Sequence, residues 1–275
     1  MEIALLNYFV FNGEIRSTCD FNPYPLKKGL AIYEVLRVQE SIPLFLDDHI
    51  RRFYNSAQFE NITIPFEPDL IRQRLKALLE YNKISTGNIK FLYHKSPDGE
   101  TCFMAWMMPF YYPSGQQYAD GVKAEIMEAE RPRPNAKKAL YALREKADEI
   151  IKKKNCFEVV YCNSRGLVTE GSRSNVFFVK DDALVTPDVS LVLPGVTRLK
   201  VMELALENGI QLKQHHINKN EIVTFDACFL TGTSPKVLPV AQLEGITYNV
   251  NHPMVHKLME AYDALAENNL KQFEW

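Results

Sequence analysis

The spacing of hydrophobic residues along the chain predicts both helices and strands. Residues 6–15 are typical of a hairpin, because two apolar runs flank the Asn12-Gly13 pair, which favours a tight turn. A helix is predicted at residues 68–83, because charged residues cover one face of it and the other face is apolar: Ile71, Leu75, Leu78 and Leu79. Another helix is expected at residues 47–59, with Asp47 or Asp48 as its cap.

The rest of the chain continues this mixture without a regular alternation of strand and helix. Strand-like runs lie at residues 29–46, 89–96, 102–112, 122–130, 157–163, 166–171, 175–187, 227–233 and 236–243. Amphipathic helices are predicted at residues 142–155, 198–209 and 252–269, the second of them closed by Gly209. The irregular order predicts an α+β (mixed α/β) fold.

Residues 114–121 form a stretch typical of a linker, because they are small and polar and lack periodicity. We therefore expect two domains that meet at a cleft. The predicted boundaries are a smaller N-terminal α/β domain at residues 1–116, a linker at 117–121 and a larger C-terminal domain at 122–275.

Composition narrows the function classes. The 275 residues carry 32 Lys and Arg against 34 Asp and Glu, and this balance argues against nucleic acid or an anionic membrane as the main partner. The longest apolar run, at 102–113, is shorter than the roughly 18–20 residues of a membrane span. Five scattered cysteines without C-x-x-C spacing indicate neither a disulfide framework nor a zinc site. His215 and His216 have no metal-ligand companions at useful spacing. We expect a cytoplasmic protein.

Several short segments carry residues that could perform chemistry, although each also has an ordinary structural explanation. The Pro-Gly turn within 193–198 precedes a helix, and it is either a plain helix start or a phosphate-binding one. The loop at 231–235 offers further N–H and hydroxyl donors. Glu170 lies in a turn, where a carboxylate is usually solvated. If it is buried, it could instead hold a proton on a heterocyclic nitrogen.

Two basic segments complete the candidate chemistry. Lys137 and Lys138 precede a helix, where lysines are usually surface charges, but an amine shielded from water can form a Schiff base with a carbonyl. Arg51 and Arg52 lie on a helix, and one of them could bind a phosphate. A phosphate-binding turn, a guanidinium, an amine and a carboxylate are together what pyridoxal 5'-phosphate requires.

Five motifs follow one another along the chain: G-x-x-x-Y-E-V-x-R at 29–37, H-x-x-R-F at 49–53, T-E-G-S-x-S-N-V-F at 169–177, L-P-G-V-T-R at 193–198 and L-T-G-T-S-x-K-V-x-P-V at 230–240. In their order and spacing they resemble the class IV pyridoxal-phosphate aminotransferases of the D-amino-acid and branched-chain type. This family also includes aminodeoxychorismate lyase. The resemblance covers most of the chain and implies the fold type IV architecture, with a cofactor cleft between two domains.

The resemblance implies which residues bind the cofactor phosphate. Arg52 matches the arginine of the H-x-x-R motif. Val196 and Thr197 would add backbone and hydroxyl donors at a helix start. Thr233, with Ser234 beside it, would close the other side.

The resemblance also implies residues around the cofactor ring. Glu170 would lie against the pyridine nitrogen, and Asn175 would brace that turn. Both Lys137 and Lys138 lie at the family's distance from Glu170. The resemblance makes Lys137 the expected Schiff-base lysine, with Lys138 as the second choice, because Lys137 follows Asn135-Ala136 and fits an ungapped count to the strand start at 157–158. Tyr141 stands where relatives often have Asn, and it would offer its hydroxyl to the cofactor.

Substrate contacts are assigned more loosely. The resemblance implies that Tyr33 lines the cleft and that Tyr93 and Lys95 bind the substrate carboxylate, although Lys95 could equally face solvent. The implied activity moves an amino group between an amino acid and a 2-oxo acid. The alternatives are β-elimination of pyruvate by aminodeoxychorismate lyase and a non-catalytic cofactor-binding or scaffold protein. The resemblance further implies a homodimer, to which residues 103–112 could contribute a surface, although they could instead be a core strand.

Overall fold

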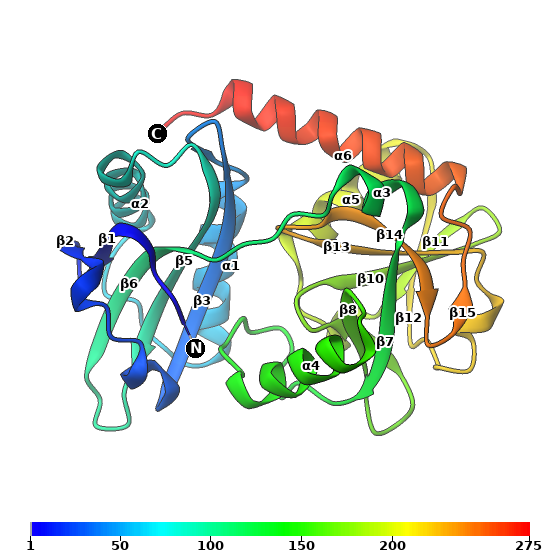
Figure 1. Cartoon of the computed structure of the whole chain (residues 1–275), viewed down its shortest axis with the longest axis horizontal. Coiled ribbons are helices and arrows are strands. Elements are labelled where there is room, and N and C mark those ends of the chain that lie inside the picture. The colour runs from blue at the N-terminus through cyan, green and yellow to red at the C-terminus, as the bar shows by residue number, and fades with distance from the viewer. Residues whose placement is uncertain (1) are drawn as a thin grey trace. The chain divides into compact units, whose positions relative to one another are not determined.

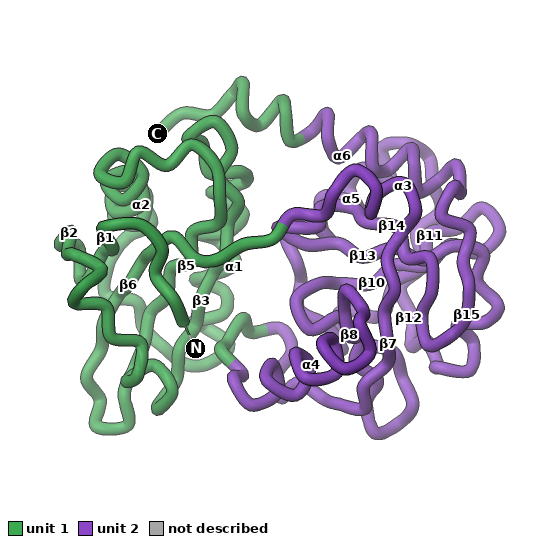
Figure 2. The backbone as a smooth tube through the Cα atoms, viewed as in Figure 1, with its two compact units in different colours: residues 1–111, 136–139, 266–275 green, residues 112–135, 140–265 purple. Residues whose placement is uncertain are grey.

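The computed structural model describes residues 2–275 and shows the predicted mixture of helices and strands (Figure 1). The chain forms two compact units (Figure 2). Unit 1 contains the described residues up to 111, together with 136–139 and 266–275. Unit 2 contains residues 112–135 and 140–265. Two short segments of unit 1, 136–139 and 266–275, are therefore far in sequence from the rest of the unit. The predicted N-terminal domain at 1–116 does not contain them.

The predicted linker at 117–121 is instead largely helical, which corrects that expectation. Helix α3 spans Gly115–Asp120, and the side chains of Ser114 and Gln117 cap its start reciprocally. The Tyr118 hydroxyl donates to the carbonyl of Pro235 at 3.0 Å, which fixes the helix to its own unit. A capping box and one tertiary hydrogen bond thus order a segment that has no hydrophobic periodicity.

A six-stranded antiparallel sheet forms the centre of unit 1, in the order β2-β1-β6-β5-β3-β4. The strands are β1 Leu5–Phe11, β2 Glu14–Ser17, β3 Leu30–Gln39, β4 Ile42–Pro43, β5 Thr86–Lys95 and β6 Thr101–Met108. The predicted hairpin is confirmed, because Asn12 and Gly13 both have positive φ, as a tight two-residue turn requires.

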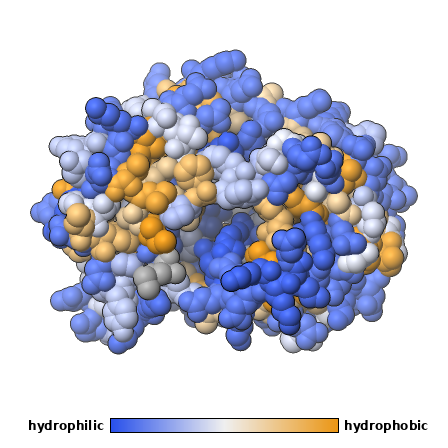
Figure 3. Space-filling model, viewed as in Figure 1, coloured by the Kyte–Doolittle hydropathy of each residue, from blue (hydrophilic) through white to orange (hydrophobic). Residues whose placement is uncertain are grey.

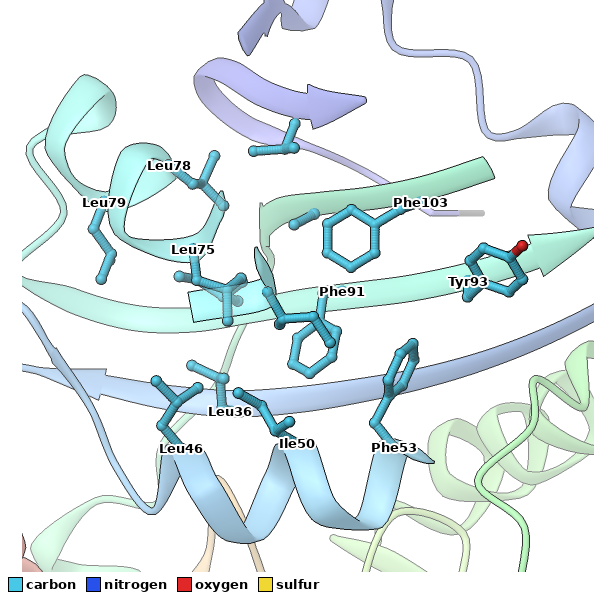
Figure 4. Packing of buried hydrophobic residues seen from close by; sticks show 14 of the residues in the cluster. Leu36, Leu46, Ile50, Phe53, Leu75, Leu78, Leu79, Phe91, Tyr93 and Phe103 are labelled. Carbon is cyan, nitrogen blue, oxygen red and sulfur yellow. The ribbon is translucent and has the colours of Figure 1, made fainter. Parts of the chain in front are cut away.

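Helices α1 (Leu46–Phe59) and α2 (Pro68–Asn82) pack on one face of this sheet. Figure 4 shows Leu46, Ile50 and Phe53 of α1 pointing into the same apolar cluster as Leu75 and Phe91. The predicted aspartate cap of α1 is wrong. The cap position is Phe45, which has no capping side chain, and the two aspartates lie in the first turn, where the helix dipole favours negative charge.

Residues 136–139 lie in extended pairing beside β3 and join it through an isolated antiparallel bridge. Lys138 pairs with Ile32, the Tyr33 N–H donates to the carbonyl of Lys137 at 3.0 Å, and the Ala139 N–H donates to the carbonyl of Ala31 at 2.9 Å. Side chains alternate between the two faces of a strand. Lys137 and Lys138 therefore point to opposite faces of this sheet.

Unit 2 contains a second, larger sheet, in the order β12-β11-β10-β13-β14-β7-β8-β9, with β15 paired to β14. The strands are β7 Val122–Glu128, β8 Glu158–Cys162, β9 Val168–Gly171, β10 Asn175–Lys180, β11 Ala183–Pro187, β12 Gln211–His215, β13 Ala227–Gly232, β14 Lys236–Leu243 and β15 Ile246–Thr247. Strands β12 and β15 have no counterpart among the predicted elements. Both are short, and β12 is largely exposed.

Helix α4 (Tyr141–Lys154) packs on β7 and β8, and α5 (Val196–Glu207) packs on β12 and β13. Helix α6 spans Pro253–Gln272. All three predicted helices of this half are present. The C-cap residue of α5 is Asn208, and the predicted glycine, Gly209, follows it with a φ of +69°. The glycine thus lies one residue beyond the cap, a position where glycine commonly ends a helix. Within residues 2–275, none of the helices combines the length and the apolar character needed to cross a bilayer.

Candidate active site

A buried ion cluster connects β3 to α1 in unit 1. The Glu34 carboxylate accepts two hydrogen bonds from Arg52, from Nε at 2.8 Å and from Nη2 at 2.6 Å. His49 Nδ1 lies 2.8 Å from Oε2 of the same carboxylate. All three side chains are buried. A two-pronged contact of this kind fixes the plane of the guanidinium as well as its position.

Burial and the nearest opposite charge shift the pKa values of Glu34 and His49 in opposite directions. Burial alone would raise the pKa of Glu34, but the charge and hydrogen bonds of Arg52, with help from His49, lower it to about 2. Burial lowers the pKa of His49 below its usual value of 6.5, and Glu34 opposes this shift. The charges of Arg52 and Lys137 lower the His49 pKa further, so Lys137 lies within electrostatic reach of the cluster.

The structure separates the two candidate lysines. The Lys137 N–H donates to Ser56 Oγ at 3.1 Å, and Lys137 Nζ lies 4.9 Å from the centre of the Tyr33 ring. Lys138 Nζ instead lies 3.4 Å from a carboxylate oxygen of Glu60, the residue that ends α1. Lys137 is thus on the Tyr33 side of the sheet, and Lys138 is on the side covered by α1.

The predicted substrate residues are not brought together. Tyr93 lies in the apolar core under α1 and α2, with its ring 6.0 Å from that of Phe66, on the opposite face of the sheet from Tyr33. Lys95 is exposed at the end of β5. The buried lysine of that strand is Lys90, whose Nζ lies 4.4 Å from the centre of the Tyr33 ring. The placement does not favour Tyr93 or Lys95 as substrate ligands.

In unit 2, Glu170 and Asn175 bind the two sides of one residue. Glu170 Oε2 accepts the N–H of Leu193 at 3.0 Å, and Asn175 Nδ2 donates to the carbonyl of Leu193 at 2.9 Å. Arg131 Nε lies 3.3 Å from Oε1 of Glu170, and both side chains are largely buried. The carboxylate is therefore held at both oxygens, by a backbone amide and by a cation.

Leu193 leads directly into the start of α5. Asn135 Nδ2 holds the preceding loop by donating to the carbonyl oxygens of Val189 and Val192. Gly195 occupies the cap position and offers no side chain to cap the first N–H groups of the helix. A Cβ on Gly195 would lie 2.2 Å from Asn175 Oδ1, so only glycine fits beside that amide.

The predicted phosphate ligands of unit 2 lie on α5 and after β13. Val196 and Thr197 are the first two residues of α5, and both are buried. The predicted ligands Thr233 and Ser234 follow β13 and are half-buried. The neighbouring Thr231 is buried, and its hydroxyl has no hydrogen-bond partner among residues 2–275.

Arg198 lies in the first turn of α5, and Tyr141 lies at the start of α4. Arg198 Nη2 donates to the carbonyl of Pro187 and to Gln214 Oε1, each at 3.0 Å. Burial lowers the pKa of Arg198 to about 10, against the opposing charges of Glu170 and Asp188. Tyr141 is the first residue of α4 and is half-buried. Within residues 2–275, no group of three or more His, Cys, Asp or Glu side chains could hold a metal ion.

Sequence reasoning missed several of the residues that build these clusters. Glu34 and His49 lie inside the Y-E-V and H-x-x-R motifs, so the motifs contained a signal that was not used. Lys90 is a charged residue within an apolar strand, which is a weaker signal. Ser56 and Arg131 carry no local signal, because a hydroxyl or a guanidinium in such segments is usually exposed.

Comparison with known proteins gives a consistent result. The sequence model of the family described as Amino-transferase class IV matches residues 31–243. The chain is 30% identical over 262 residues to the D-alanine aminotransferase of Bacillus licheniformis, covering 89% of this chain and 91% of the relative. It is 25% identical over 280 residues to the branched-chain-amino-acid aminotransferase of Pseudomonas aeruginosa, covering 92% and 89%.

The fold is similar to that of solved aminotransferases. The branched-chain amino acid aminotransferase of Escherichia coli superposes with a TM-score of 0.86 at 22% identity, and the likeness covers 95% of each chain. The family match spans well over half of the sequence, from β3 to β14. This chain belongs to the class IV aminotransferases, enzymes that use pyridoxal phosphate to move amino groups.

Proposed function

We propose that the enzyme transfers the amino group of D-alanine or of a branched-chain amino acid to a 2-oxo acid, with Lys137 as its cofactor-binding lysine. The placement of Lys137 carries this proposal. Its main chain is held on both sides, by Ser56 Oγ and by the Tyr33 N–H, and its amine lies beside the Tyr33 ring. Lys138 is engaged with Glu60 instead.

The residues present fit pyridoxal phosphate. In unit 2, Glu170 offers a buried carboxylate for the ring nitrogen. The start of α5 offers N–H groups for a phosphate, in a helix that begins at a glycine. The buried Thr231 hydroxyl, which has no partner among residues 2–275, lies next to the predicted phosphate loop and suits a polar ligand. In unit 1, Lys137 offers the amine and Arg52 a guanidinium of fixed orientation.

When bound, the cofactor supplies an electron-withdrawing ring that stabilises negative charge on the α-carbon of the amino acid. We propose that the Lys137 amine, once released by the incoming amino acid, would take the proton from the α-carbon of that amino acid and deliver it to the cofactor. Glu170 keeps a proton on the ring nitrogen, since a buried carboxylate stabilises an adjacent positive charge. We propose that Val196, Thr197, Thr233 and Ser234 would bind the cofactor phosphate, with Arg52 as a further phosphate ligand. We also propose that the Tyr141 hydroxyl contacts the cofactor.

The test is an amino-donor screen of the purified protein. D-alanine, L-leucine, L-valine and L-isoleucine are each incubated with 2-oxoglutarate, and the new 2-oxo acid is quantified. Turnover of at least one donor is expected. Pyruvate release from aminodeoxychorismate without any acceptor, in the absence of amino transfer, would show a lyase instead. In parallel, borohydride reduction and peptide mapping identify the modified lysine. Modification of Lys138 would overturn the assignment of Lys137.

We further propose that the enzyme is a homodimer, as the resemblance implies. Unit 1 exposes several large apolar and aromatic side chains, including Leu6, Tyr8, Tyr24, Phe110 and Tyr111. Figure 3 shows apolar residues gathered on the face of unit 1 that is turned to the viewer. Exposed patches of this type are common at subunit interfaces. Light scattering coupled to gel filtration should report about twice the 31.7 kDa chain mass, and a monomer would contradict the proposal.

We also propose that the enzyme acts in the cytoplasm. All five cysteines are free thiols, and three of them, Cys156, Cys162 and Cys228, are buried. Free buried thiols suit a reducing compartment. Fractionation of cells that express a tagged chain tests this proposal, and recovery of the protein outside the cytoplasmic fraction would contradict it.

A further inference from the structure

Glu158 begins β8, and its carboxylate is buried and surrounded by hydrogen-bond donors. Oε1 accepts the N–H of Val159 at 2.8 Å, the N–H of Ser172 at 3.2 Å and the hydroxyl of Ser172 at 2.6 Å. Oε2 accepts the N–H of Arg173 at 3.1 Å and the hydroxyl of Ser174 at 2.8 Å. Four of these five donors belong to the turn 172–174, which joins β9 to β10.

The turn is shaped to fit this carboxylate. A Cβ on Gly171 would lie 2.0 Å from Ser174 Oγ and 3.0 Å from Glu158 Oε2, so a side chain at position 171 is excluded. The Gly171 N–H donates to the carbonyl of Ser174 at 2.8 Å, which closes the turn. Three residues of the T-E-G-S-x-S-N motif, Gly171, Ser172 and Ser174, have no role in the proposed chemistry, and these are the ones that pack against or bind Glu158.

The residues on either side of the turn are Glu170 and Asn175. They bind the N–H and the carbonyl of Leu193, two residues before the cap of α5. A shift of the turn would therefore move both side chains and disturb Leu193. Glu158 itself contacts neither Leu193 nor α5 through any of its five hydrogen bonds.

We propose that Glu158 is a positioning residue that acts through the turn 172–174 to hold Glu170 and Asn175 in place, and through them the start of α5. This inference rests on the proposed function for the part that concerns the cofactor. Five donors around one buried carboxylate fix its position and orientation. One acidic side chain then sets the geometry of both the ring-nitrogen carboxylate and the phosphate-binding helix start.

The test compares Glu158→Gln with the wild type. An amide in place of the carboxylate brings N–H groups against the N–H groups of the turn, so part of the clamp is lost. We expect faster hydrogen exchange of peptides covering 172–175 and 189–197 in both apoprotein and holoenzyme. We also expect cofactor affinity to fall about tenfold or more, the effect of losing one or two charge-assisted hydrogen bonds. Glu244→Gln is the matched control, because Glu244 accepts the Ile126 N–H at 2.9 Å at an exposed site of the same unit.

Each outcome decides the proposal. Faster exchange at 189–197 together with weaker cofactor binding supports it. Faster exchange confined to 172–175, with unchanged exchange at 189–197 and unchanged affinity, overturns it and leaves Glu158 a local stabilising residue. If Glu158→Gln does not fold, Ser174→Ala removes one of the five hydrogen bonds and is judged by the same criteria.

A Glu170→Gln variant separates this inference from the proposed function. If Glu170→Gln keeps wild-type cofactor affinity and absorption, the role proposed for Glu170 fails. The exchange of 189–197 in the Glu158→Gln apoprotein still decides whether Glu158 positions the start of α5.

Discussion

The backbone carbonyl of Lys137 accepts the N–H of Tyr33 at 3.0 Å, while Nζ of the same lysine lies 4.9 Å from the centre of the Tyr33 ring. The main chain and the side-chain amine of Lys137 therefore both contact Tyr33, a single residue of β3. A flexible side chain loses less entropy on binding when its main chain is already fixed. This relationship distinguishes Lys137 from its neighbour and supports several predictions.

Lys137→Ala should remove the covalent attachment of the cofactor. Without the amine there is no group to bond the aldehyde, so borohydride reduction should leave the protein unlabelled by mass spectrometry, and amino transfer should be abolished. Lys138→Ala is the control and should keep the label, because it removes only the contact with Glu60. A labelled Lys137→Ala protein would show that another lysine holds the cofactor.

Ser56→Ala should destabilise the lysine segment. The Ser56 hydroxyl accepts the Lys137 N–H at 3.1 Å and donates to the carbonyl of Arg52 at 2.8 Å. Its loss leaves a polar group of the lysine segment unpaired, which costs about 1–3 kcal/mol of unfolding free energy. Urea denaturation measures this change. The exposed Ser85 provides the control, and an equal loss in Ser85→Ala would contradict a specific role for Ser56.

Gly195→Ala should weaken cofactor binding. The added methyl would lie 2.2 Å from Asn175 Oδ1 and must displace that amide or the start of α5. Overpacking of this kind costs about 1–3 kcal/mol. If the unbound protein can relieve the strain and the cofactor-bound protein cannot, the affinity for the cofactor falls about tenfold. Fluorescence titration with pyridoxal phosphate measures the affinity. Gly115→Ala, where a Cβ meets nothing within 4 Å, should bind as the wild type does.

Stability should decline in acid partly because of Glu34. Its pKa is lowered from 4.5 to about 2 in the folded protein. A lowered carboxyl pKa contributes stability that is fully present above the unfolded value and is lost as the pH falls towards the folded value. The contribution is about 3 kcal/mol, lost between roughly pH 4.5 and pH 2.

Denaturant unfolding at pH 5.0, 4.0 and 3.5 checks this prediction. The wild type should lose free energy of unfolding more steeply than Glu34→Gln, which is less stable at pH 5 but lacks the titrating group. Parallel lines for the two proteins would show that Glu34 titrates alike in the folded and unfolded states.

Much of the fold was predictable because it depends on local patterns. The apolar face of α2, the Asn12-Gly13 turn and the paired strands β5 and β6 follow from short-range spacing. The strand β12 was not predictable, because its pairing with β11 joins residues far apart in sequence and its side chains are mostly exposed.

Candidate site residues could be proposed from the sequence only where motifs named them. Glu170 and Arg52 lie in motifs and are buried, while their roles toward the cofactor stay predictions. Glu158 lies outside every motif, and its importance comes from a turn that begins fourteen residues later. Tyr93 was assigned from its strand, but the alternation of side chains turns it into the core. A linear pattern does not show which distant residues form hydrogen bonds, or which face of a sheet a side chain occupies.

The bridge that joins residues 136–139 to β3 has a consequence for dividing the polypeptide. A break at residue 111 leaves Tyr33 and Ser56 on one fragment and the lysine that they anchor on the other. Neither fragment alone can present a fixed lysine, so two separately expressed halves should be inactive until they are mixed. Recovery of activity on mixing would then report that residues 136–139 and 266–275 of the second fragment have rejoined unit 1.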